Sequence, residues 1–236
     1  MQRYFAKSKD EKTFVLKDSD LHHIKQVMRM KIGTTIEVVY NSLVYECKIN
    51  NINPFELEII KQLEINTELK TKIILGVAMV KEQKFDIILQ KATELGVTTV
   101  VPIIMDRCIV KLSEDKIDKK LQRWNTICKE AAEQSFRNNI PSVCNPIKIK
   151  DLPQIESDLK LVCSVNETQK NLKTYLQSKN SYDKILLVIG PEGGISPREE
   201  EYLMNNNFNS VSLGNRVLRV ETACLYACSV ISYEVE

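Results

Sequence analysis

Residues 185–196 read Ile-Leu-Leu-Val-Ile-Gly-Pro-Glu-Gly-Gly-Ile-Ser. The five apolar residues predict a buried strand, which runs directly into a glycine-rich loop. In open α/β sheets, ligands bind at the carboxyl ends of the strands. Three glycines and one proline within five residues exceed what a tight turn needs, and glycine lets a ligand approach backbone groups closely. We therefore expect the loop 190–194 to bind a ligand.

The residues after this loop predict a well-defined helix start. Ser196 occupies the N-cap position, Pro197 the first helical position and Glu199 the third, as in a capping box. The loop is thus fixed by a strand on one side and a capped helix on the other. A loop that is already ordered loses less entropy when it binds.

A second strand ends in a glycine a short way downstream. A short strand is expected at residues 210–213, before Gly214, and four of the seven glycines fall between positions 190 and 214. Arg216, Arg219 and Glu221 follow, and then a helix of small residues. We interpret Ala223, Cys224, Ala227 and Cys228 on this helix as packing residues, within the chain or across a dimer.

From residue 71 onward, strands and helices alternate. An apolar stripe from Phe85 to Leu95 predicts a helix that ends at Gly96, and a longer helix is expected over residues 117–138. Strands are expected at 72–80, 98–104, 142–147, 159–165, 185–189 and 210–213. Regular alternation predicts an α/β domain with a mostly parallel sheet.

The first part of the chain has a different pattern. One helix starts near Asp18, with Leu21, Ile24 and Met28 expected to face a core. Three strands at 34–40, 43–49 and 55–65 follow, the first two joined by a turn at Asn41-Ser42. The polar stretch 64–71 marks the boundary. We predict two domains, a small β-barrel over residues 1–70 and the α/β domain over residues 71–236.

Composition narrows the class of protein. A 43% hydrophobic and 27% charged chain of 236 residues is typical of a globular protein with a core. Its longest apolar stretch, eight residues from Ile73 to Val80, is far shorter than the ~20 of a membrane span. The N-terminus lacks the features of a secretory signal, so a cytoplasmic location is expected. Seven scattered cysteines fit reduced thiols.

Charge is unevenly distributed although the net charge is only +2. Residues 1–31 hold eight Lys/Arg against four Asp/Glu, whereas residues 32–70 hold three against six. Lys25 and Arg29 are four residues apart and are expected on one helix face, beside His22. A local basic face of this kind can contact RNA phosphates, although a solvated surface with chance asymmetry would look the same.

Several common sites have no basis in the sequence. It contains no GxGxxG, no P-loop and no nucleophile elbow to accompany His22-His23. Cys224 and Cys228 lack a nearby histidine, so a metal site is not expected. On the long helix Arg123, Glu130, Gln134 and Arg137 fall in one narrow wedge, which indicates a solvated, salt-bridged face or an approach surface.

Five separated segments, together with the opening Arg3-Tyr4-Phe5, resemble the RsmE family. They are the loop 190–194, residues 213–223, the segment 130–137 (Glu-Ala-Ala-Glu-Gln-Ser-Phe-Arg), the segment 90–97 (Gln-Lys-Ala-Thr-Glu-Leu-Gly-Val) and the pair Arg107-Cys108. Members of this family are bacterial SPOUT-superfamily enzymes that methylate N3 of one uridine in 16S ribosomal RNA with S-adenosylmethionine. Asn215 and Cys224 depart from the common pattern.

The resemblance implies an architecture and partners. A PUA-like N-terminal barrel would hold small-subunit ribosomal RNA, or the assembled small subunit. The C-terminal α/β domain would carry a parallel sheet, flanked by helices, whose last segments thread into a trefoil knot. The chain would form a homodimer with the cofactor site near the subunit interface.

It also implies residue roles, which we state as hypotheses. S-adenosylmethionine would bind Ile189, Gly190, Pro191, Glu192, Gly193, Gly194, Leu213, Gly214, Arg216, Val217, Leu218, Thr222 and Ala223. Catalytic candidates, which stabilise the uracil anion, orient groups or accept its proton, are Arg107, Glu130, Arg137, Arg219 and Glu221. His22, Lys25 and Arg29 would contact RNA. The alternatives are methylation of another RNA target, at a ribose 2′-OH or a tRNA base, and a non-catalytic RNA-binding assembly factor.

Overall fold

The computed structural model describes residues 1–10, 13–110, 114–179 and 181–236. The chain divides into two compact units, which we call unit 1 and unit 2. Unit 1 consists of Met1–Glu68 together with Ala132–Asn139, and unit 2 of Leu69–Ala131 together with Ile140–Glu236.

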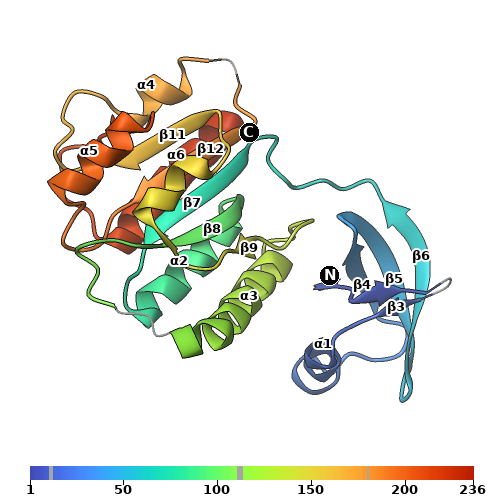
Figure 1. Ribbon diagram of the computed structural model, residues 1–236. Helices are drawn as coiled ribbons and strands as arrows, with labels where there is room; N and C mark the ends of the chain where they lie inside the picture. The colour runs from blue at the N-terminus through green and yellow to red at the C-terminus, as the bar shows by residue number, and fades with distance from the viewer. Residues whose placement is uncertain (11–12, 111–113, 180) are drawn as a thin grey trace. The chain divides into compact units, whose positions relative to one another are not determined.

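Unit 2 is built on a seven-stranded sheet with the strand order β10-β8-β7-β12-β11-β13, with β9 paired to β8 (Figure 1). Every pairing in this sheet is parallel, which confirms the predicted α/β class. Its strands are β7 (Lys72–Ala78), β8 (Val97–Ile104), β9 (Ser142–Val143), β10 (Ile147–Lys148), β11 (Leu159–Cys163), β12 (Lys184–Ile189) and β13 (Asn209–Val211). Its helices are α2 (Glu82–Glu94), α3 (Ile117–Gln134, ending in unit 1), α4 (Leu172–Leu176), α5 (Pro197–Asn205) and α6 (Val220–Val235), with 3₁₀ turns at Glu114–Lys116 and Ile149–Gln154.

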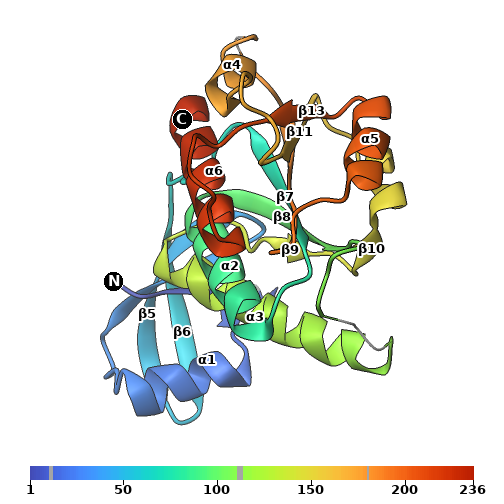
Figure 2. The ribbon, with the colours of Figure 1, turned by 90° about the vertical axis from the view of Figure 1, so that its left-hand side faces the viewer.

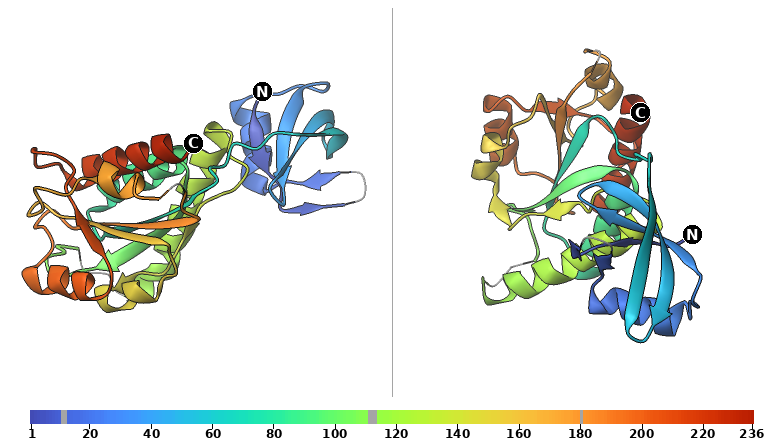
Figure 3. Two further views of the ribbon diagram at one scale, coloured as in Figure 1. Left: turned by 90° about the horizontal axis from the view of Figure 1, so that it is seen from above. Right: turned by 90° about the vertical axis from the view of Figure 1, so that its right-hand side faces the viewer.

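Helices cover both faces of this sheet, because successive residues of a strand point to opposite sides. On β12, Leu187 and Ile189 belong to one buried cluster, which also takes in residues of α2 and α6. Leu186 and Val188 belong to a second cluster, with Leu203 of α5. The view from above shows α6 and α5 on opposite sides of the sheet (Figure 3). A strand buried on both faces reads as a continuous apolar run, which is why 185–189 shows no alternation.

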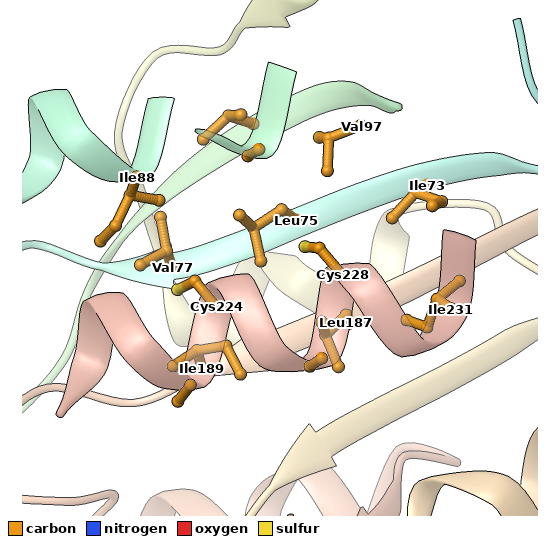
Figure 4. Packing of buried hydrophobic residues seen from close by; sticks show 14 of the residues in the cluster. Ile73, Leu75, Val77, Ile88, Val97, Leu187, Ile189, Cys224, Cys228 and Ile231 are labelled. Carbon is orange, nitrogen blue, oxygen red and sulfur yellow. The ribbon is translucent and has the colours of Figure 1, made fainter. Parts of the chain in front are cut away.

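The last helix packs through the small residues that the sequence indicates. Ala227, Cys228 and Ile231 have no exposed surface, and α6 runs beside α2 (Figure 2). Figure 4 shows Cys224 and Cys228 facing the side chains of β7 and β12. The interpretation of these cysteines as packing residues is therefore confirmed.

Unit 1 contains a four-stranded sheet with the order β1-β4-β5-β6 and a separate β2-β3 pair. The elements are β1 (Arg3–Phe5), β2 (Ser8–Lys9), β3 (Phe14–Val15), α1 (Asp18–His22), a π-helical turn (His23–Val27), β4 (Thr35–Tyr40), β5 (Leu43–Ile52) and β6 (Phe55–Leu63). Asn41 and Ser42 have φ angles of 49° and 65°, the left-handed conformation that a two-residue hairpin turn requires. The predicted strands and turn of this region are confirmed.

The helix near residue 20 is shorter than the sequence predicts. The α-helix ends at His22, the π-helical turn ends at Val27, and Arg29 has a φ of 49°. Ile24 is fully buried as expected, but Met28 is 47% exposed, so the prediction that it faces the core is wrong. A π-helical turn contains more residues than an α-helical turn. Residues four apart, such as Ile24 and Met28, therefore no longer point to the same side. Lys25 and Arg29 do not share one helix face, because Arg29 lies beyond the end of the π-helical turn at Val27.

The long helix also ends earlier than predicted, at Gln134, because Phe136 takes a φ of 55°. The segment 132–139 that follows belongs to unit 1, which a boundary at residue 70 does not anticipate. Arg3 Nη1 donates hydrogen bonds to the carbonyls of Phe136 and Arg137, and its guanidinium pairs with Glu37. The side chain of Asn138 donates to the carbonyls of Ser42 and Ile65.

Within residues 1–10, 13–110, 114–179 and 181–236, no helix combines the length and the apolar character that crossing a membrane takes.

Candidate functional site

Three loops leave the carboxyl ends of strands in unit 2, at one edge of the sheet. They are residues 105–108 after β8, residues 190–196 after β12, and residues 212–219 after β13. In the sheet β11 lies between β12 and β13, so the two glycine-containing loops emerge on either side of one strand. This is the edge at which parallel sheets bind ligands.

The loop 190–196 has a closely packed backbone. A Cβ atom at Gly190 would lie 2.5 Å from Ile195 Cγ1, so only glycine fits. Gly194 has a φ of 72° and its N–H donates to the carbonyl of Pro191 at 2.9 Å. Both halves of the predicted capping box are present, since Ser196 accepts from the Glu199 N–H and Glu199 accepts from the Ser196 N–H. The helix start predicted at this position is confirmed.

The loop after β8 holds the loop 190–196 from its side. Arg107 Nη1 donates to the carbonyl of Gly193 at 2.9 Å and to that of Ile195 at 3.5 Å. The Asp106 N–H donates to Glu199 Oε1 at 2.8 Å, and Ser196 Oγ donates to Asp106 at 2.9 Å. The guanidinium of Arg107 therefore binds backbone that is itself part of the candidate site.

The loop after β13 presents an open backbone. Gly214 has a φ of 102°, and a Cβ atom there would meet nothing within 4 Å. Val217 is 85% exposed, although it lies three residues from Val220, the buried first residue of α6. An apolar side chain and bare backbone groups at the edge of a sheet can contact the flat, polar-edged surface of a nucleoside.

Lys84, which was not among the candidates from the sequence, links the loop 190–196 to the first turn of α6. Lys84, in the first turn of α2, donates from Nζ to Glu192 Oε1 at 2.9 Å and lies 3.8 Å from Glu221 Oε2. The hydrogen bond with Glu192 raises the pKa of Lys84. Burial alone would raise the pKa of Glu192. The hydrogen bonds that its carboxylate accepts from Lys84 and from the Glu192 backbone together outweigh burial, so the pKa of Glu192 is lowered. Both groups are therefore charged at neutral pH.

Glu221 lies in the first turn of α6, two residues after Arg219 at the N-cap. Its Oε2 atom is buried and has no hydrogen-bond partner among the described residues, although Lys84 is nearby. A buried carboxylate oxygen normally has a hydrogen-bond donor. A ligand that brings a donor or a positive charge would complete this site.

Cys224 and Cys228 take no part in this arrangement. Burial raises the pKa of Cys228 to about 12 and that of Cys224 well above its usual value, so both thiols stay neutral. Neutral buried thiols are neither nucleophiles nor metal ligands. Within the described ranges, no cluster of three or more His, Cys, Asp or Glu is arranged to hold a metal ion.

The candidate residues are not all brought together. Gly190–Gly194, Arg107 and Glu221 form the connected set described above, and Arg219 acts electrostatically on Lys84. Glu130 is exposed on α3. Arg137 belongs to unit 1, where it is 4% exposed and pairs with Glu68 through Nη2.

The proposed RNA contacts also belong to unit 1. His22 and Arg29 are exposed, and Lys25 Nζ donates to Asn53 Oδ1 at 2.9 Å. The neighbouring His23 hydrogen-bonds through Nδ1 to the hydroxyl of Tyr4 at 2.9 Å, so of the two histidines it is His22 that is open to a partner.

Two functional positions, Lys84 and Asp106, were missed. Both follow the carboxyl end of a parallel strand, β7 or β8, and this placement could have identified them. Glycine after a strand pointed to the loop 190–194, but the strand 72–80 is followed by Lys81-Glu82-Gln83, which has charge and no glycine. Which carboxylates they contact depends on long-range packing.

Comparison with known proteins agrees with this arrangement. Residues 67–232 match the model of an RNA methyltransferase domain, and residues 16–61 that of an RNA methyltransferase PUA domain. Ribosomal RNA small subunit methyltransferase E from Bacillus subtilis (strain 168) is 35% identical, over 100% of this chain and 98% of its own length. The enzyme of the same name from Mesomycoplasma hyopneumoniae (strain 232) is 36% identical, over 96% of each chain.

A solved structure is similar over nearly the whole chain. It is ribosomal RNA small subunit methyltransferase E from Neisseria gonorrhoeae bound to S-adenosyl methionine, with a TM-score of 0.88 and 29% identity, covering 99% of this chain and 97% of that one. The parallel sheet, the PUA-like unit and the two full-length relatives lead to one assignment. The chain belongs to the RNA methyltransferase family of ribosomal RNA small subunit methyltransferase E.

Proposed function

We propose that this protein transfers a methyl group from S-adenosylmethionine to N3 of a uridine in small-subunit ribosomal RNA. The observation that carries the proposal is the pair of loops on either side of β11, in a chain similar over its full length to small-subunit methyltransferases. Arg107 holds the first of these loops, and Lys84 links that loop to Glu221, which follows the second. The family resemblance supplies the target atom, and the site supplies groups suited to the reaction.

The proposed cofactor residues are those of the two loops and their flanks. They are Ile189, Gly190, Pro191, Glu192, Gly193, Gly194, Leu213, Gly214, Arg216, Val217, Leu218, Thr222 and Ala223. The exposed backbone at Gly214 and the carboxylates of Glu192 and Glu221 suit a ligand with a nucleoside and a positive charge. Bound there, S-adenosylmethionine supplies an electrophilic methyl group, which uridine N3 takes up by in-line displacement with release of S-adenosylhomocysteine.

Uridine N3 carries a proton, which has to leave for N3 to attack. Among the two acidic candidates we favour Glu221 as its acceptor over Glu130, because Glu221 Oε2 is buried, lacks a hydrogen-bond donor among the described residues and belongs to the connected loops. A carboxylate held ready for a proton contributes by general base catalysis.

Removing the proton leaves negative charge on the uracil ring. Arg219 and Arg216 are exposed beside Glu221, and we assign them to stabilise this charge. Arg107 contributes by positioning, because its guanidinium already donates to the Gly193 and Ile195 carbonyls. Arg137 is buried against Glu68, and we assign it a structural role.

The uridine has to leave any base stack to reach such a site, so the target is single-stranded or flipped. His22, Lys25 and Arg29 of unit 1 would contact RNA phosphates. We further infer that the enzyme acts in the cytoplasm as a homodimer, with the cofactor site near the interface, and that the end of the chain is knotted.

The test is to incubate the protein with labelled S-adenosylmethionine and small ribosomal subunits from a strain that lacks it, and to digest the RNA to nucleosides. We expect label in 3-methyluridine, with naked 16S RNA as the comparison substrate. Label in a 2′-O-methyl nucleoside, in another base or in transfer RNA would contradict the proposal. Cofactor binding without any transfer would also overturn it.

A further inference from the structure

Lys84 lies between the two loops of the candidate site. Its Nζ atom donates to Glu192 of the loop 190–196 at 2.9 Å and lies 3.8 Å from Glu221, which follows the loop 212–219. All three side chains are between 19% and 30% exposed. Within the described part of the chain, Lys84 is the cation that lies within ion-pair distance of both Glu192 and Glu221.

The position of this lysine is unfavourable for its own helix. Lys84 is the third residue of α2, and the positive end of the helix dipole disfavours a cation there. The same turn carries Glu82, which pairs instead with Lys120 and Arg123 of α3. The two carboxylates of the loops therefore account for a cation at this position, whereas helix stability does not.

Ion pairs that are this exposed contribute little to the stability of a fold. They can still set the position of a segment, because a cation between two carboxylates loses both contacts if either loop moves away. Glu192 belongs to the loop after β12, and Glu221 to the first turn of α6, into which the loop after β13 leads. One ammonium group thus links two carboxylates that are 29 residues apart in sequence.

We propose that Lys84 is a positioning residue for methyl transfer, which holds the loops 190–196 and 212–219 in the arrangement that binds the methyl donor. The inference rests on the proposed function for the identity of the ligand. The coupling of the two loops through Lys84 does not depend on that identity, so it can be measured without a ligand.

The variants are Lys84→Met, which keeps the length of the side chain without its charge, and Lys84→Arg, which keeps the charge. Lys91→Met is the matched control, because Lys91 is also on α2 and pairs with Glu94 of its own helix. The first measurement is amide hydrogen exchange in the ligand-free chain. We expect faster exchange at residues 192–196 and 214–221 in Lys84→Met than in Lys91→Met.

The second measurement is the Kd for S-adenosylhomocysteine by calorimetry. We expect Lys84→Met to weaken binding by about tenfold or more, which is about 1.4 kcal/mol. Lys84→Arg should recover most of the affinity and Lys91→Met should bind like the wild type. The double variant Lys84→Met/Glu221→Gln should raise the Kd by less than the product of the two single fold-changes, because both substitutions remove the same Lys84–Glu221 interaction.

The outcomes separate the two proposals. Unchanged exchange and affinity in Lys84→Met, or no recovery in Lys84→Arg, would show that Lys84 does not position the loops. Faster exchange in both loops of Lys84→Met, with no binding of S-adenosylhomocysteine by the wild type, would support the coupling and overturn the proposed function.

Discussion

Arg107 Nη1 donates a hydrogen bond to the carbonyl oxygen of Gly193 at 2.9 Å. The contact joins the loop after β8 to the loop after β12, and a Cβ atom at position 193 would lie only 3.2 Å from Arg107 Cβ. The arginine thus packs on the bare backbone of the glycine as well as bonding to it. Its charge is directed at protein backbone, which is the basis for assigning it a positioning role.

Arg107→Ala should therefore weaken cofactor binding. We expect the Kd for S-adenosylhomocysteine to rise by about tenfold, because the charged donor to two carbonyls is lost. Calorimetry measures the change, and Arg198→Ala, at an exposed arginine of α5, is the control. If Arg107→Ala bound the cofactor normally and lost only methyl transfer, Arg107 would act on the RNA base instead.

Gly190→Ala should disrupt the same loop by steric overlap. The added Cβ would lie 2.5 Å from Ile195 Cγ1, and Gly190 is not among the glycines with positive φ, so backbone strain is not involved. We expect a loss of about 1–3 kcal/mol in the free energy of unfolding, from denaturation curves, and weaker cofactor binding.

The double variant Gly190→Ala/Ile195→Ala tests the cause. Shortening Ile195 removes the overlapping Cγ1 atom, so the double variant should bind the cofactor better than Gly190→Ala alone. Equal loss in both would mean that the glycine is needed for direct contact with the ligand and not for loop packing.

Arg137→Ala should destabilise the fold. The side chains of Arg137 and Glu68 are 5% and 13% exposed, so removing one partner leaves a buried charge. We expect a decrease of about 3–5 kcal/mol in the free energy of unfolding by urea. Lys61→Ala, at an exposed lysine paired with Glu46, is the control and should change it by less than about 1 kcal/mol. Normal stability with abolished methyl transfer would return Arg137 to the catalytic candidates.

Lys25→Ala/Arg29→Ala should change how RNA binding depends on salt. Each lost phosphate contact lowers the slope of log affinity against log salt by roughly 0.7–0.9, so we expect a decrease of about 1.4–1.8 for the two residues. Titration of a ribosomal RNA fragment at several salt concentrations measures it, with Lys184→Ala, paired with Glu156 in unit 2, as the control. An unchanged slope would exclude these residues from the RNA interface.

Asp158 gives a prediction about pH. Its Oδ2 accepts the N–H groups of Lys184 and Asp183 at the start of β12, and these bonds lower its pKa below the ordinary 3.8. Because the pKa of Asp158 is lower in the folded chain than in the unfolded chain, its carboxylate stabilises the fold at pH values above the unfolded-state pKa. This stabilisation is lost as the pH falls through the pKa of the folded state. The urea midpoints of wild type and Asp158→Asn should therefore differ at pH 7 and converge below about pH 4. A constant difference would contradict this.

Much of the fold could be predicted because local rules decide it. The apolar run 185–189, the cap at Gly96 and the capping box of Ser196 and Glu199 each depend on residues close in sequence. Their positions in the structure match the predictions. The glycine loops were found for the same reason, since a strand that ends in glycine is visible in one short stretch.

The parts that could not be predicted depend on distant residues. Met28 is exposed because a π-helical turn shifts the register, which no apolar spacing indicates. Arg137 is buried because Glu68, far away in sequence, pairs with it in unit 1. Lys84 lies next to two loops that follow it by more than a hundred residues, so its role becomes visible only in the folded chain.

The central claim is that residues 190–194 and 213–223 together bind the methyl donor. A crystal structure of the protein with S-adenosylhomocysteine tests it most directly. We predict density for the nucleoside between these two segments, with Lys84 still in contact with Glu192 and Glu221. Density elsewhere in the chain, or both segments closed on each other by their own side chains in crystals grown with saturating ligand, would contradict the account.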